Sequence, residues 1–539
     1  MTYPSHPAAP ADSGRLAYKW KVLISVVFGI FMAILDTTVV NVAFQTLRTE
    51  YGASLNDAQW IISIYVLSLG ITTPLSGFLA DRFGMKRTYL SGLTLFVTGS
   101  LLCGFAPNLG LLIAARAIQG MGGGIALPLG SAFLLRTFPP HEQGKALGFF
   151  GIALVLAPAL GPILGGYLVD HNLWRWIFFI NIPVGVFGVW LGSRWMREIK
   201  GERKPTLDVW GLVTEIIGFG SVLYAASIAS DRGWTDPSVL LWFGIGAAGL
   251  IAFALVELFV AKDPLLDLTL FKKRVFLNAS LVGYVSVLAL FGAEFLLPVY
   301  LQALRGKTAF ETGLILLALA VASGFATPTA GRLYDKVGPR PLVATGFTIL
   351  LINTWQLSQL KADTPISWIV FLLALRGLAL GMTVQTTFVT ALSQVPLQKT
   401  ARGSSLVNST RQVVQSIGVA ILATVLASTL SPQVKNLQAQ MQEQAPVAGA
   451  PRFGLCEVPS APTASIAGSG ATAVALPPQA MAQIQQACDE SVAGFERAYK
   501  VTFFAALAAL ALGLMLPGWP GKFAGRRAAD QPTRAPAAH

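Results

Sequence analysis

The chain reads Gly77-Phe-Leu-Ala-Asp81-Arg82-Phe-Gly84-Met-Lys86-Arg87 in one polar loop and Gly331-Arg-Leu-Tyr-Asp335-Lys336-Val-Gly338-Pro-Arg340-Pro341 in a second. Gly, Leu, Asp, a basic residue, Gly and a second basic residue align at a constant offset of 254 residues. Each loop follows a long apolar run, and both are expected on the same side of a membrane. Such a parallel repeat predicts two six-helix bundles, related by pseudo-two-fold symmetry, around a central cavity.

The composition around these loops indicates a membrane protein. Of the 539 residues, 54% are hydrophobic and 12% are charged, whereas a soluble domain carries about 25% charged residues. Apolar runs of bilayer-spanning length recur, and helices are expected because an open strand leaves backbone groups unsatisfied in lipid. We therefore expect an all-α polytopic protein with 14 transmembrane helices, near 20–42, 58–79, 88–106, 109–134, 144–168, 175–196, 209–229, 238–260, 276–301, 308–331, 342–360, 366–388, 402–430 and 497–517.

The positions of the basic residues predict the orientation. The net charge is +13, and with the N-terminus inside, the inner loops and tails hold 26 Lys and Arg while the outer loops hold 10. Lys and Arg concentrate in cytoplasmic loops of membrane proteins, so both termini are expected in the cytoplasm. The polar, proline-rich residues 1–18 do not resemble a cleaved signal. A nucleic-acid partner is excluded because the Lys and Arg residues lie in short loops between the apolar runs, as in the cytoplasmic loops of membrane proteins.

The runs divide the chain into segments. Residues 1–19 and 518–539 are expected to be cytoplasmic tails, 20–196 and 276–517 the two bundles, and 197–275 an inserted helix pair with its linkers. The tract 431–496 is expected outside, and it holds Cys456 and Cys488. Two cysteines in an oxidising compartment suggest a disulfide, and two unpaired thiols are the alternative. Cys103, inside the third helix, is expected to pack.

Several motifs carry a resemblance to a known family. They are the loop signature after the second helix, Leu35-Asp36-Thr-Thr-Val-Val-Asn41-Val-Ala43, Trp60 with Tyr65, Arg116-x-x-Gln119-Gly120-Met-Gly122-Gly123, Pro158-x-x-Gly161-Pro162-x-x-Gly165-Gly166 and Trp174-Arg-Trp176-x-Phe178-Phe179-x-Asn181-x-Pro183. Together they resemble the fourteen-helix drug:H⁺ antiporter branch of the major facilitator superfamily, over nearly the whole chain. One departure is that the first-helix motif of the family continues to Ala-Leu-Pro, whereas this chain has Ala43-Phe44-Gln45.

Charged residues inside apolar runs are the candidates for proton coupling, because burying a charge in hydrocarbon is costly. Asp36 and Arg116 are expected at a similar depth in the outer half of the N-terminal bundle, where they can pair. The resemblance implies that both take part in proton coupling, and a static ion pair is the alternative. Glu294 is expected to be a second proton site or an anchor for a cationic substrate, or else a packing residue near the outer interface.

The repeated loop and the fifth helix are candidate gating elements. The gating loop comprises Gly77, Asp81, Arg82, Gly84, Arg87 and, in the second repeat, Asp335. Asp81 is expected to pair with Arg136 when the inner gate is shut, with a solvated loop charge as the alternative. The resemblance implies that Gly161, Pro162, Gly165 and Gly166 form the motif linked with antiporters, although a glycine-rich helix is often only packing.

Polar and aromatic residues in the runs are candidates for a substrate pocket. They are Asn41, Trp60, Tyr65, Gln119, Phe291, Phe295, Arg411 and Gln412. Arg411 and Gln412 lie on a polar helix face that lines the cavity or, as an equal alternative, forms hydrogen bonds between helices. Glu215 and Glu257, near the cytoplasmic ends of the inserted helices, are expected to be structural because their side chains can reach the interface.

The motifs also exclude classes of function. The four histidines fall in tails or loops, no His/Cys cluster fits a metal site, and no P-loop is present, so we expect no cofactor, no ATP and no enzyme activity. The prediction is a proton-coupled antiporter of the bacterial cytoplasmic (inner) membrane that exports drugs or other amphipathic small molecules, hydrophobic or cationic, with a possible periplasmic adaptor. The alternatives are an exporter of one endogenous metabolite, an uptake symporter, and a non-transporting scaffold or enzyme.

Overall fold

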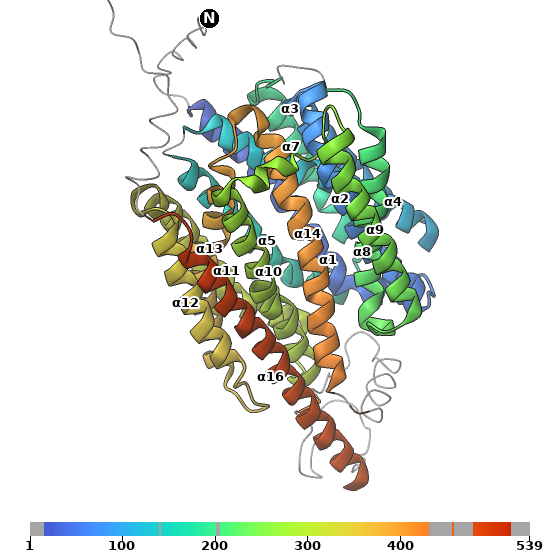
Figure 1. Cartoon of the computed structure of the whole chain (residues 1–539). Coiled ribbons are helices and arrows are strands. Elements are labelled where there is room, and N and C mark those ends of the chain that lie inside the picture. The colour runs from blue at the N-terminus through green and yellow to red at the C-terminus, as the bar shows by residue number, and fades with distance from the viewer. Residues whose placement is uncertain are drawn as a thin grey trace, which may run out of the picture.

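The computed structural model describes residues 16–139, 142–200, 205–429, 431, 455–456 and 478–518. Figure 1 shows long, closely packed helices, and no strand occurs within these ranges. Helices lie at each of the fourteen predicted positions in the described part of the chain. Eleven of them are long and apolar enough to cross a bilayer by length and composition. The all-α membrane fold is therefore confirmed, while the number of crossings remains a prediction.

The first half of the chain forms the N-terminal bundle. Its helices are α1 (Tyr18–Glu50), α2 (Leu55–Phe83), α3 (Met85–Gly104), α4 (Leu109–Thr137), α5 (Gln143–Asp170) and the short α6 (Trp176–Phe179), which leads into α7 (Asn181–Trp195). The inserted pair follows as α8 (Val209–Arg232) and α9 (Pro237–Leu255), which ends in the π-turn η2 (Val256–Val260). A 3₁₀ turn, η3 (Leu268–Lys272), precedes the second bundle.

The second half forms the C-terminal bundle. Its helices are α10 (Arg274–Val299), ending in the π-turn η4 (Tyr300–Leu304), then α11 (Ala309–Val337), α12 (Pro339–Leu357), α13 (Ile366–Leu392), the 3₁₀ turn η5 (Leu397–Lys399), α14 (Thr400–Ser428) and α16 (Pro478–Leu514). Figure 1 shows α8 and α9 at one edge of the molecule and α12 at the other. Within the inserted pair, α8 packs on α2 and α14, so it borders both bundles, and α9 packs on α8.

The repeat seen in the sequence extends through whole helices. α2 and α11 have equal lengths, and they begin and end 254 residues apart. The same offset relates their N-caps, since Ser54 accepts a hydrogen bond from the Asp57 amide and Thr308 accepts one from the Glu311 amide. At the other ends, Gly84 and Gly338 adopt φ values of 98° and 82°, which favour glycine.

Two helices are longer than predicted. α1 continues to Glu50 rather than ending near residue 42, and α16 begins at Pro478 rather than near residue 497. Part of the predicted loop 431–496 is therefore helical. Hydropathy misses this stretch of α16 because it is polar overall, yet Ala487, Cys488 and Phe495 are buried along it. We call the end of the molecule that holds Asp81 and Arg402 the Arg402 end, and the opposite end, with Cys456 and Cys488, the disulfide end.

Candidate functional site

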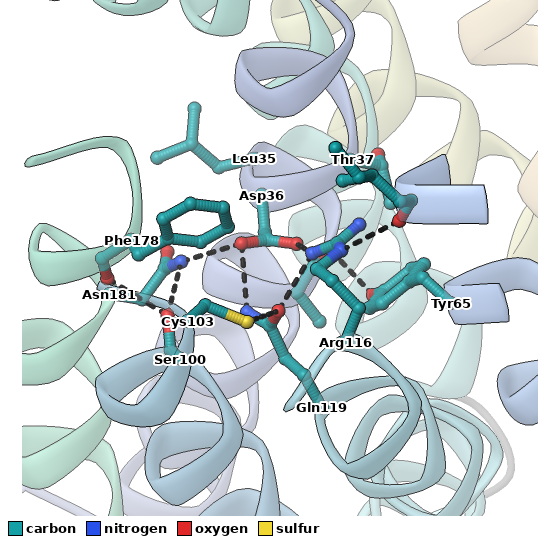
Figure 2. A network of polar contacts seen from close by, with 12 residues as sticks. Leu35, Asp36, Thr37, Tyr65, Ser100, Cys103, Arg116, Gln119, Phe178 and Asn181 are labelled. Atoms are coloured by element: carbon teal, nitrogen blue, oxygen red, sulfur yellow. Dashed lines mark hydrogen bonds and ion pairs between the residues drawn. The ribbon is translucent and has the colours of Figure 1, made fainter. Parts of the chain in front are cut away.

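A buried carboxylate lies at the centre of the N-terminal bundle. Asp36 on α1 has no exposed surface, and its Oδ2 lies 2.5 Å from a guanidinium nitrogen of Arg116 on α4. The other oxygen, Oδ1, accepts hydrogen bonds of 2.8 Å from the side-chain amides of Gln119 and Asn181. Figure 2 shows these groups converging on Asp36 from α4, which carries Arg116 and Gln119, and from α7, which carries Asn181. The predicted contact between Asp36 and Arg116 is thus present.

The side chains that bind Asp36 make further contacts, which hold them in position. Arg116 also donates to the Ile61 carbonyl at 3.1 Å and to Gln119 Oε1 at 2.7 Å, and its guanidinium lies 4.2 Å from the centre of the Tyr65 ring. Ser100 accepts from Asn181 at 3.0 Å and donates to the Phe178 carbonyl at 2.8 Å. The network therefore ties α1, α2, α3, α4, α6 and α7 together.

This arrangement can respond chemically to a single proton. A buried ion pair is kept by its geometry and by the additional hydrogen bonds around it, and loss of one charge leaves the other uncompensated. Protonation of Asp36 would leave the Arg116 guanidinium buried without an anionic partner among the groups described above. The contacts that this network makes on α1, α2, α4 and α7 would then change together.

Glycines bring the network helices close enough for these contacts. A Cβ atom added to Gly99 on α3 would lie 2.6 Å from the Gln119 amide nitrogen, and one added to Gly120 on α4 would lie 2.4 Å from the Tyr65 carbonyl. Both distances are too short for any larger residue. The Gly120 that follows Arg116 and Gln119 in the sequence motif therefore allows α2 and α4 to touch backbone to backbone.

Helix α5 lies between this site and the other half of the molecule. A Cβ on Gly161 would lie 2.0 Å from Oγ1 of Thr38, two residues from Asp36, and one on Gly165 would lie 3.2 Å from the Val39 carbonyl. Gly166 is buried as well, and α5 continues through Pro162. On its other side α5 meets α11, where a Cβ on Gly144 would lie 2.4 Å from the Gly331 carbonyl. The motif glycines therefore pack α5 against α1 of the same bundle, while Gly144, outside the motif, makes the contact with α11 of the other bundle.

The bundles are joined at the Arg402 end by polar contacts. Nε of Arg402, on α14, lies 2.7 Å from Oδ2 of Asp81 on α2. Next to this pair, Ser76 contacts Ser405 at 3.2 Å, and Ser131 contacts Ser404 at 2.8 Å. Gly77 lets α14 approach, because a Cβ there would lie 3.0 Å from the Arg402 Cα. These contacts close the Arg402 end between the two halves.

The predicted partner of Asp81 was Arg136, and the structure places a different residue there. Arg136 instead donates to Thr400 Oγ1 at 2.8 Å and to the Gln398 carbonyl at 2.5 Å, so it also reaches the start of α14. The expectation was wrong about the partner because it drew on the N-terminal bundle alone. The ion pair that forms here crosses between the bundles.

The other loop residues hold neighbouring segments in place. Arg82 donates to the Pro205 carbonyl at 2.7 Å, and Arg87 lies 3.8 Å from Glu198, whose carboxylate also accepts from two amides that follow Gly84. Asp335 lies beside α5, since its Oδ1 would be 3.1 Å from a Cβ on Gly144.

A further ion pair reinforces the same end. Lys399 Nζ lies 2.7 Å from Asp267, in the linker before the C-terminal bundle. Burial raises the pKa of Asp267, but hydrogen bonds from Lys399 and Thr269 outweigh that effect and hold the pKa below its ordinary value. Asp267 therefore stays ionised at neutral pH and keeps the linker attached to the start of α14.

The pocket candidates do not form one cluster. Tyr65 and Gln119 belong to the Asp36 network, whereas Trp60 stacks on Tyr224 of the inserted helix α8 at 5.7 Å. Asn41 is exposed. The side chains of Phe291, Glu294 and Phe295 lie outside the described residues, although their backbone belongs to α10.

Arg411 and Gln412 lie on the face of α14 that borders other helices. Gln412 approaches Gly70 on α2, where an added Cβ would lie 3.9 Å from its Cγ. Arg411 lines a cavity of about 20 Å³ with Tyr284 on α10 and Thr387 on α13. That space suits a water molecule rather than a drug, so in this conformation the cavity is not a substrate pocket.

The C-terminal bundle contains a buried arginine on α13, the helix that corresponds to α4. Arg376, on α13, is fully buried, and it donates to the Ala289 carbonyl on α10 and to Asn353 and Thr354 on α12 at 3.3 Å. Each bundle therefore places a guanidinium on its fourth helix, bonded to its first.

Sequence reasoning missed several residues of the site. Asn181 was quoted as part of a motif without a role, Cys103 was expected only to pack although its Sγ lies 3.7 Å from Gln119 Oε1, and Ser100 was not singled out. Arg402 was also missed. The only available signal was a basic residue at the start of a predicted helix, which does not identify its partner.

The disulfide end is tied by a covalent bond. Cys456 and Cys488 form a disulfide with a Cα–Cα distance of 5.2 Å. The amides of Leu455 and Cys456 donate at 3.0 Å to the carbonyls of Ala303 and Leu304, at the end of η4. The disulfide thus links the polar part of α16 to the end of α10.

Comparisons with known proteins agree with this architecture. The family model of the Major Facilitator Superfamily matches residues 26–419. The chain is 37% identical over 404 residues to YhcA of Bacillus subtilis, an uncharacterised MFS-type transporter, covering 75% of this chain and 76% of YhcA. It is 31% identical to the lincomycin resistance protein LmrB of Bacillus subtilis (76% and 85% covered) and 30% identical to the multidrug resistance protein B homolog of Mycobacterium tuberculosis (85% and 87% covered).

A solved structure shares the fold. The human organic anion transporter MFSD10 superposes with a TM-score of 0.58 at 13% identity, covering 92% of this chain and 100% of that one. Two helical bundles with buried charges and transporter relatives define a multi-pass membrane transporter, not an enzyme. The chain belongs to the Major Facilitator Superfamily.

Proposed function

We propose that this transporter is a proton-coupled antiporter, which exports hydrophobic or cationic small molecules across the bacterial cytoplasmic membrane. The observation that carries the proposal is the Asp36–Arg116 pair, buried to 0% and 1% exposure, with Gln119 and Asn181 completing the hydrogen bonds of the carboxylate. A carboxylate in that setting changes its interactions with α4, through Arg116 and Gln119, and with α7, through Asn181, when it gains a proton. The proton gradient is then the energy source, and no bound cofactor is needed.

The transport cycle we propose is alternating access. The Arg402 end is the cytoplasmic gate, closed in this conformation by Asp81–Arg402, Ser76–Ser405 and Ser131–Ser404. Helix α5 touches α1 beside Asp36 and α11 in the other bundle, which provides a route from the carboxylate to the interface between the bundles. Proton binding at Asp36 releases Arg116. The helices that carry this pair then move, and the equilibrium between the state with the cytoplasmic gate closed and the state with it open shifts.

The substrate class in this proposal draws on the relatives. Those named for lincomycin or multidrug resistance match three quarters or more of the chain at about 30% identity. The same fold also serves transporters with other substrates, such as the human organic anion transporter MFSD10. A dedicated exporter of one endogenous metabolite and an uptake symporter therefore remain as the competing functions.

Transport in everted vesicles distinguishes export by antiport from symport. An acidic vesicle interior drives protons out, so an antiporter accumulates substrate inside and a symporter loses it. We expect accumulation of lincomycin or of a cationic dye that collapses when the pH gradient is dissipated. Efflux of preloaded substrate on acidifying the interior would establish symport instead. If no compound of an amphipathic panel is transported and one endogenous metabolite is, the protein is a dedicated exporter of that metabolite.

A further inference from the structure

The inserted helices contain a pair of buried acidic residues that the proposed mechanism does not use. Glu215 on α8 is 0% exposed, and Glu257 in η2 is 6% exposed. The sequence suggested that both side chains reach the interface, and this was wrong because α8 and α9 enclose them. Neither oxygen of Glu215 has a hydrogen-bond partner, and the same holds for Glu257 Oε2.

Close packing of α8 against α9 brings the carboxyl groups of Glu215 and Glu257 to the same helix–helix interface. Gly211 lies one turn before Glu215 on the same helix face, and a Cβ there would lie 3.0 Å from Glu257 Oε1. On the next turn, a Cβ on Gly218 would lie 2.8 Å from the Leu250 amide on α9. Glu215 is therefore held between two glycine contacts, facing the helix that leads to Glu257.

The surroundings of the pair disfavour a second negative charge. The charged groups that act on Glu257 are Asp208 at the N-cap of α8 and Arg402 on α14, while α9 carries no charged residue. Asp208 Oδ2 also lacks a partner. An ionised carboxylate needs a cation or hydrogen-bond donors, and neither oxygen of Glu215 accepts a hydrogen bond among the described residues. The neutral, protonated form of Glu215 is therefore the one that these surroundings favour.

The pair is connected to the gate through two linker residues. Glu257 Oε1 accepts from the Leu265 amide at 3.1 Å, and the preceding carbonyl, that of Pro264, accepts from Arg402 at 3.0 Å. The same Arg402 holds Asp81 at 2.7 Å. The segment Pro264–Leu265 is therefore fixed at one side by the acidic pair and at the other by the residue that closes the Arg402 end.

We propose that Glu215 and Glu257 form a second proton-binding site, which holds a proton while the Arg402 end is closed and releases it when that end opens. Opening moves Arg402 away from Pro264, frees the linker and lets water reach the pair. No group of three metal-binding side chains occurs among the described residues, so the ligand that we propose for the pair is a proton. By linkage, acid stabilises the closed Arg402 end and rising pH favours its opening.

Two measurements on the full chain in nanodiscs test this proposal. Infrared difference spectroscopy detects the carbonyl stretch of a buried protonated carboxyl group, and we expect one such band to persist in Asp36→Asn and to disappear in Glu215→Gln.

Spin labels on Phe83→Cys and Leu397→Cys, at positions that are 55% and 58% exposed at the gate, report its opening by pulsed electron paramagnetic resonance. We expect the open fraction to rise with pH in the otherwise unaltered chain.

The variants decide the outcome. These variants are compared in an Asp36→Asn background, which removes the contribution of Asp36 to the gate. Glu215→Gln keeps the shape of the neutral acid, so we expect a closed gate whose label distances no longer depend on pH, with Glu257→Gln as an independent second variant. Glu496→Gln, at an exposed ion pair on α16, serves as the control and should retain the pH response. A band that survives in Glu215→Gln, or an unchanged pH response in both variants, would overturn the proposal. Since Asp36→Asn is measured separately, failure here leaves the proposed antiport untouched.

Discussion

Asp36 and Arg116 are 80 residues apart in the sequence, yet their side chains meet at 2.5 Å in the interior of the N-terminal bundle, with 0% and 1% of their surfaces exposed. Burial makes the pair strongly interdependent, because each charge is compensated mainly by the other. Gln119 and Asn181 stabilise the carboxylate, but neither supplies a charge. The properties of the site therefore depend on the protonation of one group.

Breaking this pair on one side should destabilise the bundle. Arg116→Met leaves the Asp36 carboxylate buried without a cation, and we expect a loss of about 3–5 kcal/mol. Asp36→Asn combined with Arg116→Met removes both charges and should recover much of that loss. The measurement is the apparent midpoint of thermal unfolding in detergent for both singles and the double variant. Equal midpoints for Arg116→Met and the double variant would mean that the pair is not coupled.

The contact between Asp81 and Arg402 should control access to the interface at the Arg402 end. Ser404 is fully buried there against Ser131, so a cysteine at this position reports opening. In a Ser404→Cys background we expect Arg402→Gln to speed labelling by a membrane-impermeant maleimide by about tenfold, which corresponds to about 1.4 kcal/mol lost from closure.

The matched control for this experiment is Arg332→Gln, a basic residue of the repeated loop whose side chain is exposed. It should label at the rate of the parent. Equal labelling rates for Arg402→Gln and Arg332→Gln would show that the ion pair does not hold the gate.

The close approach of α5 and α11 should tolerate no side chain. Gly144→Ala places a methyl group 2.4 Å from the Gly331 carbonyl, and overpacking of this kind costs about 1–3 kcal/mol. We expect a lower unfolding midpoint and slower transport. Gly324→Ala, on α11 itself, meets nothing within 4 Å and serves as the control. If both alanine variants transport at the parental rate, the glycine contact has no part in the conformational change.

Removing the disulfide should weaken the disulfide end. Replacing Cys456 and Cys488 by serine opens a link between residues 32 apart, and we expect a loss of about 2–4 kcal/mol. Reduction of the parent protein should lower the unfolding midpoint by the same amount. Peptide mapping under non-reducing conditions checks the bond directly, and recovery of both cysteines as free thiols would refute it.

The sequence allowed prediction of features that involve charge and repetition. A charge within an apolar run is conspicuous, so Asp36 and Arg116 could be paired by their depth alone. The offset of 254 residues predicted equivalent bundles, and α2 and α11 follow it to their caps.

Other features of the site could not be predicted from the sequence. Asn181 and Ser100 are uncharged, so nothing in a hydropathy pattern distinguishes them from the other polar residues of long helices. The partner of Asp81 depended on how the two bundles dock, since Arg402 is 321 residues away. The burial of Glu215 likewise depended on which face of α8 meets α9.

The most direct test of the central claim separates substrate exchange from proton coupling in proteoliposomes. Asp36→Asn keeps the size of the side chain but fixes it in a neutral form. We predict that this variant still exchanges labelled for unlabelled substrate, but shows no accumulation driven by a pH gradient and no substrate-dependent proton movement. Asp170→Asn, at the exposed end of α5, should behave like the parent. Accumulation by Asp36→Asn at the parental level, driven by the same pH gradient, would contradict the account.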